Sequence, residues 1–230
     1  MMEVTPGLSV ELIVTADGSH TLHLTGLAEN YHSIHGAIAE SEHIYLVAGF
    51  DFARHGHEKL SILEIGFGTG LNALLTCIRS IKEDIKVDFT SIELYPLPEE
   101  IYSRLNYTGL IDFPGVPGIF EKLHTSPWNE TLRITEYFSL HKMHVSLLEF
   151  QPENSRYDLI YFDAFGPDIQ PLMWNPDVFK KMAFCLKNGG ALVTYSTKGT
   201  VKRNLKEAGF SIEKLPGPIG KREILRAILI

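Results

Sequence analysis

Residues 61–72 read SILEIGFGTGLN, and this stretch decides the fold. From Ser61 to Ile65 apolar and polar residues alternate too little for a half-exposed strand, so the segment predicts a buried parallel strand. Glycines at 66, 68 and 70 then let the chain turn sharply into a helix that begins near Leu71. Such a turn leaves backbone N–H groups free at the start of the helix and leaves space for a ligand. We therefore predict a nucleotide-like ligand here.

The residues around this turn favour S-adenosylmethionine over a dinucleotide. A dinucleotide site needs the spacing Gly-x-Gly-x-x-Gly, but this chain has Leu71 three residues after Gly68. Glu64 precedes the turn, where a carboxylate would repel a phosphate and attract a cation. S-adenosylmethionine has no phosphate and carries two positive groups. The predicted cofactor contacts are Glu64, Gly66, Phe67, Gly68, Thr69 and Gly70, and the alternative is a tight turn that binds nothing.

The composition predicts one catalytic-sized domain. With 230 residues, of which 44% are hydrophobic, the chain can bury one core but is short for two. It has no apolar run of membrane-spanning length, and its N-terminus lacks the pattern of a signal peptide. We expect a soluble, cytoplasmic protein with no membrane partner. Cys77 and Cys185 fall in apolar helical patterns and are predicted buried thiols, and the histidine pairs lack a third ligand, so we expect no metal.

The charges are unevenly distributed along the chain. Residues 180–230 hold 11 Lys and Arg against 3 Asp and Glu, a net of +8, which leaves 10 against 25, or −15, for residues 1–179. An asymmetry of this kind is typical of a surface that faces a polyanion. A solvated basic face without a partner explains the same counts.

Two further strands end in carboxylates. Residues 86–93 predict a strand that ends at Glu93, where an acid can accept hydrogen bonds from both ribose hydroxyls. Residues 157–162 predict a buried strand that delivers Asp163 to its tip. Ligands of open α/β sheets bind beyond these tips, so Asp163, Glu93 and the glycine turn should share a crevice. A solvated strand-end acid and a turn-forming Asp are the alternatives.

The remaining elements complete an α/β pattern. Residues 10–14 and 20–24 predict a β-hairpin that covers the main fold, and residues 35–52 an amphipathic helix. We further predict a short helix over 98–106, a loop over 111–118, and paired strands over 132–138 and 142–150. Last come a helix over 175–187, a strand over 191–195, a helix capped by Thr197, and strands over 210–215 and 223–230. This is the Rossmann-like layout of class I methyltransferases, with residues 1–30 as an N-terminal β-hairpin extension and 31–230 as the methyltransferase domain.

Several segments together resemble one family, the methyltransferase half of the bacterial bifunctional enzyme that makes 5-methylaminomethyl-2-thiouridine at the wobble position of tRNA. The matching segments are residues 66–72 (GFGTGLN), 162–167 (FDAFGP), 173–174 (MW), 208–210 (AGF) and 220–225 (GKREIL). Tyr31 and Ser33 match a Tyr-x-Ser of the family. The similarity begins near residue 30 and runs to the C-terminus, and the segment around Asp163 is more specific than the glycine turn.

The resemblance implies methyl transfer from S-adenosylmethionine to the aminomethyl nitrogen of the modified uridine of tRNA. Because the amine must lose a proton, we hypothesise that Asp163 is the catalytic residue, which accepts a hydrogen bond from the amine and takes up the proton, and we expect Tyr31 to contact the cofactor. By the resemblance, Ser146 and Leu147 lie beside adenine, where the family usually has an acid. Because the oxidase half is absent, we expect a stand-alone enzyme without FAD, as a monomer or weak dimer. The expected substrate contacts are Phe165 at the base and Lys198, Lys202, Arg203, Lys221 and Arg222 at phosphates.

Two other functions remain open from the residues alone. A methyltransferase for a small molecule or a protein, or an aminopropyltransferase of the spermidine synthase type, would share the glycine turn and the strand-tip acids. A polyamine pocket, however, needs several acids near Asp163, and only Asp168 is a candidate in the sequence. A non-catalytic RNA-binding module would keep the fold, but the intact acids Glu64, Glu93 and Asp163 argue against it.

Overall fold

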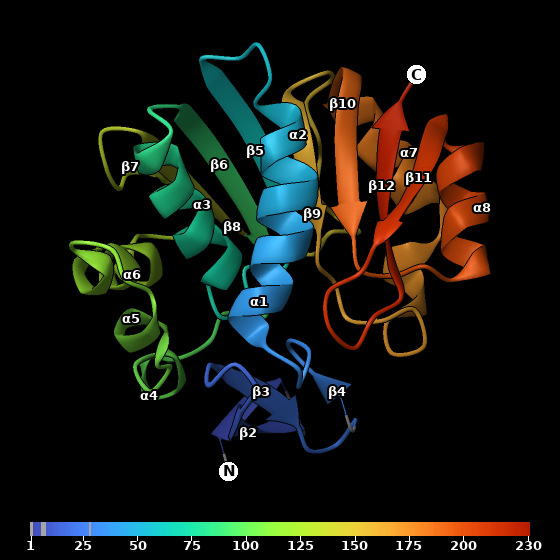
Figure 1. The fold of residues 1–230 in the computed structure, drawn as a ribbon. Coiled ribbons are helices and arrows are strands. Elements are labelled where there is room, and N and C mark those ends of the chain that lie inside the picture. The colour runs from blue at the N-terminus through green and yellow to red at the C-terminus, as the bar shows by residue number, and fades with distance from the viewer. Residues whose placement is uncertain (1, 6–7, 28) are drawn as a thin grey trace.

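An eight-stranded sheet forms the centre of the computed structural model, which describes residues 2–5, 8–27 and 29–230 (Figure 1). Its order is β11-β12-β10-β9-β5-β6-β8-β7. The five middle strands are mutually parallel, namely β10 (Leu186–Thr194), β9 (Tyr157–Phe162), β5 (Lys59–Ile65), β6 (Lys86–Glu93) and β8 (Phe138–His144). The outer strands β12 (Glu223–Leu229), β11 (Phe210–Pro216) and β7 (Thr131–Arg133) pair antiparallel.

Helices cover both faces of this sheet, which explains why its central strands β5, β6 and β9 are buried along most of their length. All six residues of β9 are buried. Leu159 and Tyr161 belong to one core cluster, whereas Ile160 and Phe162 belong to the other. Successive side chains of a strand point to opposite faces, so a strand with a core on each side needs no polar alternation. The predicted strands over 61–65, 86–93 and 157–162 are confirmed.

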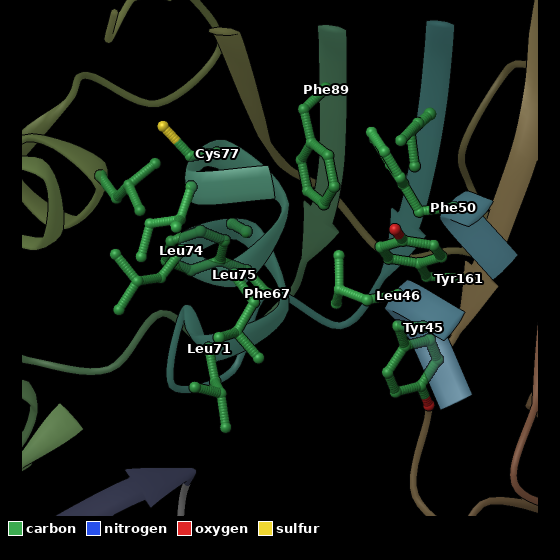
Figure 2. Packing of buried hydrophobic residues seen from close by; sticks show 14 of the residues in the cluster. Tyr45, Leu46, Phe50, Phe67, Leu71, Leu74, Leu75, Cys77, Phe89 and Tyr161 are labelled. Carbon is green, nitrogen blue, oxygen red and sulfur yellow. The ribbon is translucent and has the colours of Figure 1, made fainter. Parts of the chain in front are cut away.

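One face packs on α3 (Leu71–Lys82) and on a continuous helical segment before β5. That segment consists of α1 (Ala37–Ser41), the π-helix η1 (Glu42–Phe50) and α2 (Asp51–Ala53). Figure 2 shows Tyr45 and Phe50 of the π-helix packed toward Tyr161 of β9, and the Tyr45 and Tyr161 ring centroids lie 5.1 Å apart. The helix predicted over 35–52 is confirmed, although its middle part is π-helical, a form that is frequent at functional sites.

The other face packs on α7 (Pro176–Cys185), α8 (Gly199–Glu207) and the short 3₁₀ helix η2 (Pro171–Trp174). Three short helices, α4 (Glu99–Tyr102), α5 (Tyr107–Leu110) and α6 (Val116–Thr125), lie toward the β7 edge (Figure 1). Cys77 and Cys185 are both buried free thiols, as predicted.

The N-terminal residues form a separate antiparallel sheet of β1 (Met2–Thr5), β2 (Leu8–Val14), β3 (His20–Leu24) and β4 (Glu29–Asn30). The predicted hairpin is confirmed as β2 and β3, which pair from Val14 with His20 to Val10 with Leu24. Figure 1 places this sheet beneath the central one, at the end where β10 finishes. It is therefore more than a hairpin, and it lies against the tips of the central strands.

Two predictions between β6 and β9 were wrong. The loop predicted over 111–118 contains the start of α6, whose first turn accepts Pro117 because that position needs no N–H donor. The paired strands predicted over 132–138 and 142–150 are shifted, since β7 ends at Arg133 and β8 already begins at Phe138. Lys142 is buried in β8 with only 1% of its surface exposed, and this lysine breaks the apolar alternation on which the prediction depended.

Two boundaries after β9 also differ. The helix predicted over 175–187 ends at Cys185, and β10 begins at Leu186 with an irregular register up to Ala191. Thr197 does not cap α8, because Lys198 occupies the N-cap position and gives no side-chain hydrogen bond there. Glycine-rich residues after a helix thus belong here to an irregular strand instead of a helix cap.

Candidate functional site

A cavity of about 770 Å³ lies at the carboxyl ends of the central strands. Its walls come from the glycine turn, from the tips of β6 and β9, from the segment between β4 and α1, and from the loop between β11 and β12. The N-terminal sheet closes one side through Leu24, Glu29 and Asn30. The cavity therefore stands where open α/β sheets bind their ligands.

Strand register brings the predicted residues together. Ile65 of β5 lies level with Ile92 of β6 and Phe162 of β9, so the next residues of the three strands meet. The Gly66 amide donates to the Ile92 carbonyl at 2.9 Å, and the Asp163 amide donates to the Ile65 carbonyl at 3.1 Å. Gly66, Glu93 and Asp163 all line the cavity.

The glycine turn needs its glycines for space as well as for backbone conformation. Gly66 has a φ of 93°, which disfavours a side chain, and a Cβ there would lie 3.0 Å from the Asp163 carbonyl oxygen. A Cβ at Gly68 would lie 3.3 Å from the ring of Tyr31, which packs over the turn. Tyr107 anchors the turn from outside, because its hydroxyl donates to the hydroxyl of Thr69 at 3.2 Å.

Backbone amides of the glycine turn and of the loop after β6 hold the carboxylate of Glu93. Its Oε2 accepts from the Gly68 amide at 3.0 Å, and its Oε1 accepts from the Tyr95 amide at 2.8 Å. Burial raises the pKa of Glu93, while the backbone N–H donors oppose this shift. Each carboxylate oxygen has two acceptor positions, so two backbone bonds leave further acceptor positions at the cavity wall.

Asp163 has an environment suited to proton transfer. Its Oδ2 accepts from Asn72 Nδ2 at 2.9 Å, and the buried Tyr45 is close enough for the charge of Asp163 to raise the pKa of its hydroxyl. Burial raises the pKa of Asp163 to about 7, the hydrogen bond from Asn72 and the charge of Lys221 lower it, and the charge of Glu40 raises it. A carboxyl with this pKa changes protonation near neutral pH, as a general base requires.

Aromatic rings and one ion pair surround Asp163. Tyr31 and Phe165 make an edge-to-face contact with ring centroids 5.0 Å apart. Lys221 lies 5.0 Å from the Tyr195 ring centroid, and its Nζ pairs with Glu40 Oε1 at 3.1 Å. Lys221 was predicted to contact phosphate, but the structure places it in the cavity wall with its charge paired.

Glu64, which the sequence analysis expects to present a negative charge to the ligand, lies in β5 just before the glycine turn. Its side chain is completely buried and is not part of the cavity wall. Burial raises the pKa of Glu64 well above its ordinary value, and the nearby charges of Asp163 and Glu93 act in the same direction, while the hydrogen bonds from Ser91 and Asn72 oppose this shift. A direct role of Glu64 toward a cofactor stays a prediction.

Several other predicted contacts lie outside the cavity wall. Val145 and Leu147 line it, but Ser146 does not, because its hydroxyl accepts from the Leu148 amide at 3.2 Å within a turn. Lys198 pairs with Asp168 on the surface. The remaining basic residues of the prediction, Lys202 and Arg203 on α8 and Arg222 in the loop before β12, are half-buried or exposed, and their phosphate contacts stay predictions.

The cavity also contains residues that the sequence analysis did not select: Glu29, His32, Glu40, Asn72 and Tyr195. Asn72 and Tyr195 were within reach of prediction, since Asn72 follows the glycine turn and Tyr195 follows the tip of β10. Glu29 and Glu40 gave no local signal, because the packing of the N-terminal segment under the sheet brings them to the site.

No group of three or more His, Cys, Asp or Glu side chains within residues 2–5, 8–27 and 29–230 is placed to hold a metal ion. Within the same ranges, every helix is too short or too polar to span a membrane.

Comparisons with known proteins agree with this geometry. A family model described as S-adenosyl-L-methionine-dependent methyltransferase matches residues 115–230. The tRNA 5-methylaminomethyl-2-thiouridine biosynthesis bifunctional protein MnmC of Azoarcus sp. (strain BH72) is 30% identical over 98% of this chain and 36% of its own length. The same-named protein of Ralstonia nicotianae is 29% identical over 84% of this chain and 31% of its length. The chain thus spans about a third of the length of these relatives.

Solved structures show the same fold. MNMC2 from Aquifex aeolicus has a TM-score of 0.77 at 24% identity and covers 96% of this chain and 70% of its own. Spermidine synthase from Thermotoga maritima has a TM-score of 0.59 at 14% identity, with 98% and 71% covered. The family model matches half of the sequence, and the cavity stands at the strand tips of the corresponding fold. The chain therefore belongs to the S-adenosyl-L-methionine-dependent methyltransferase family.

Proposed function

We propose that this protein methylates the aminomethyl nitrogen of 5-aminomethyl-(2-thio)uridine at the wobble position of tRNA, giving 5-methylaminomethyl-(2-thio)uridine. The observation that carries the proposal is Asp163, a carboxyl with a pKa of about 7 beside the glycine turn and within an aromatic wall. The name of the MnmC relatives supports the tRNA nucleoside as the substrate.

The site has features that fit S-adenosylmethionine. Gly66 and Gly68 keep the turn open to a ligand, and Glu93 has acceptor positions left for the ribose hydroxyls. Tyr31 packs over the turn, and Leu147 and Ile92 give the wall apolar surface for the adenine ring. When bound, S-adenosylmethionine supplies a methyl group carried on positively charged sulfur.

The residues of this chain would prepare the amine for attack. An alkylamine is mostly protonated at neutral pH and has no lone pair to offer in that form. Glu29 and Asp163 give the cavity negative charge, which favours entry of an ammonium group. Asp163 takes one proton from the ammonium, and the nitrogen lone pair becomes available. Asn72 holds the Asp163 carboxylate in place during this transfer.

Phe165 and Tyr31 would hold the uracil ring. Their edge-to-face contact leaves aromatic surface at the cavity, and single-stranded or flipped bases stack on such surfaces. The exposed cations Arg203 and Arg222 would contact phosphates without reading the sequence.

The direct test is methylation of tRNA that carries the aminomethyl intermediate. The protein is incubated with this tRNA and isotopically labelled S-adenosylmethionine, and wobble nucleosides are analysed by mass spectrometry. We expect label in 5-methylaminomethyl-(2-thio)uridine with the native protein, and none with Asp163→Asn, which should still bind the cofactor by calorimetry. Unlabelled wobble uridine with the native protein would refute the proposal.

A second experiment tests the phosphate contacts. Arg222→Ala should weaken tRNA binding and reduce the slope of log affinity against log salt by about 1. The matched control is Lys206→Ala, because Lys206 is an exposed cation in the last turn of α8. Equal slopes for the native protein and Arg222→Ala would remove this surface from the proposal.

Aminopropyl transfer to a polyamine is the second candidate, because Glu29 and Glu40 supply acids near Asp163 that the sequence did not reveal. The pairing of Glu40 with Lys221 reduces the charge available for a second ammonium group, which favours methyl transfer. Incubation with putrescine and decarboxylated S-adenosylmethionine separates the two candidates, since only an aminopropyltransferase would form spermidine.

A further inference from the structure

The N-terminal sheet contributes one acid, Glu29, to the cavity wall. Glu29 lies level with Leu24 in the pairing of β4 with β3, and Leu24 is buried and also lines the cavity. Residues opposite each other in an antiparallel pair share a face of the sheet, so the Glu29 side chain is on the cavity side as well. The next residue, Asn30, points to the other face, where its Oδ1 lies 2.8 Å from His23 Nδ1.

Tyr31, two residues after Glu29, shows where this face of the sheet leads. The Tyr31 amide donates to the Leu22 carbonyl at 2.9 Å, so the pairing continues past β4 and Tyr31 shares the face of Glu29. The Tyr31 ring contacts Phe165, which follows Asp163 by two residues in the cavity wall. Because two residues of a strand span about 7 Å, Glu29 stands one side-chain position away from this aromatic wall.

Glu29 differs from the other acids of the cavity wall in having no partner for its charge. Glu40 pairs with Lys221, and Glu93 and Asp163 both accept hydrogen bonds. Among the residues that the structure describes, the Glu29 carboxylate has neither an ion pair nor a hydrogen bond, although the residue is half-buried. A half-buried carboxylate attracts a cation more strongly than an exposed one, because less water screens its charge.

Both ligands of the proposed reaction carry an ammonium group, namely the aminomethyl group of the substrate and the amino-acid end of S-adenosylmethionine. The surroundings of Tyr195 favour the substrate. Burial raises the pKa of Tyr195, and the charges of Asp163 and Glu29 raise it further, so both acids lie near the same hydroxyl. This hydroxyl donates to the carbonyl of Ala164, the residue after Asp163, at 2.8 Å. Glu29 therefore lies on the same side of the cavity as the proposed base.

We propose that Glu29 is a specificity-determining residue, which binds the ammonium group of the substrate and orients it toward Asp163. This inference rests on the proposed function, because it requires an amine as the substrate. The Glu29 carboxylate attracts a uridine side chain that ends in an ammonium group and repels one that ends in a carboxylate. Glu29 thus recognises the amine, and Asp163 removes its proton.

Calorimetry with RNA hairpins tests this role without turnover. Each hairpin is an anticodon stem-loop with uridine, 5-aminomethyluridine or 5-carboxymethyluridine at the wobble position, and S-adenosylhomocysteine occupies the cofactor site. The native protein should bind the aminomethyl hairpin more tightly than the uridine hairpin. Glu29→Gln should reduce this preference about 10- to 100-fold, as expected for the loss of a charge-assisted hydrogen bond. The same variant should bind the carboxymethyl hairpin more tightly than the native protein does.

The matched control is Glu11→Gln, which removes the same charge from an exposed position of β2 in the same sheet. This control should leave all three RNA affinities unchanged, and both variants should bind S-adenosylhomocysteine as the native protein does. Equal preferences of the native protein and Glu29→Gln would overturn the proposal. Weaker binding of S-adenosylhomocysteine to Glu29→Gln would also overturn it, because Glu29 would then bind the amino group of the cofactor. If the native protein prefers the aminomethyl hairpin but transfers no methyl group, the proposed function fails and the role of Glu29 in binding the amine stands.

Discussion

Replacement of Asp163 by asparagine should stabilise the protein at alkaline pH, although it should abolish turnover. Burial raises the pKa of Asp163 from 3.8 to about 7, so the folded state holds this proton more tightly than the unfolded state. A carboxyl with a raised folded pKa contributes stability below its unfolded pKa and loses it as the pH rises through the folded pKa. Asparagine resembles the neutral form at every pH and avoids this loss.

The size of the effect follows from the shift. At about 1.36 kcal/mol per pKa unit, ionisation of Asp163 costs about 4 kcal/mol in total, of which about 1.5 kcal/mol is already lost by pH 5. Between pH 5 and pH 8 the stability of Asp163→Asn relative to the native protein should therefore increase by about 2.5 kcal/mol. The proposed role of Asp163 as a base near pH 7 thus has a cost in stability at neutral pH, a trade that is frequent at active sites.

Urea unfolding of both proteins at pH 5 and pH 8 measures this difference. Other titrating groups are common to both proteins and cancel in the comparison, provided that the dependence of unfolding free energy on urea keeps the same slope. A relative stability that does not change between pH 5 and pH 8 would show that Asp163 has an ordinary pKa. The argument for Asp163 as a base near neutral pH would then fail.

Three further predictions follow from the site. The value of kcat/KM should fall about tenfold per pH unit below pH 7, because Asp163 of the free enzyme must be ionised to take the proton, and a flat profile would contradict this. Glu93→Gln should weaken S-adenosylmethionine binding by about 10- to 100-fold in calorimetry, since charge-assisted hydrogen bonds are lost, and unchanged affinity would remove Glu93 from the site. Burial lowers the pKa of Lys142 to about 8, so the folded state loses this proton more readily than the unfolded state. Between pH 8 and pH 10.5 the free energy of unfolding of the native protein should therefore increase by about 3 kcal/mol relative to that of Lys142→Met. The same pH dependence of stability in both proteins would contradict this shift.

The strands that form the site were predictable because their burial pattern is local. Residues 61–65 are followed by Gly66, residues 86–93 end at Glu93, and residues 157–162 are followed by Asp163. Parallel register then places these three ends together. The predicted bounds of β8 were wrong for an equally local reason. Lys142 is buried under Phe67 and Trp128, with its Nζ 4.7 Å from the Trp128 ring centroid. Stabilisation of a buried ammonium by aromatic rings cannot be read from residue spacing.

The wall of the cavity was less predictable, because it depends on segments far apart in the chain. Glu40 comes from a helix near the N-terminus and Lys221 from the loop before the last strand, and they meet only in the folded protein. The same packing pairs the charge of Lys221, which the sequence analysis assigned to phosphate. A count of basic residues gives the charge of a segment but not the charges that remain unpaired after folding.

The three acids of the site show that the position of a carboxyl group in the sequence does not determine its role. Glu64, Glu93 and Asp163 all lie at or next to the tips of neighbouring strands, so the sequence gives them equal weight. In the folded protein, Glu64 is completely buried and accepts from the Ser91 hydroxyl. Glu93 accepts from two backbone amides, and Asp163 accepts from Asn72 near Lys221. Carboxyls whose surroundings separate their pKa values take different roles. We propose that Glu93 is an acceptor for the cofactor sugar and that Asp163 is the group whose protonation changes during turnover.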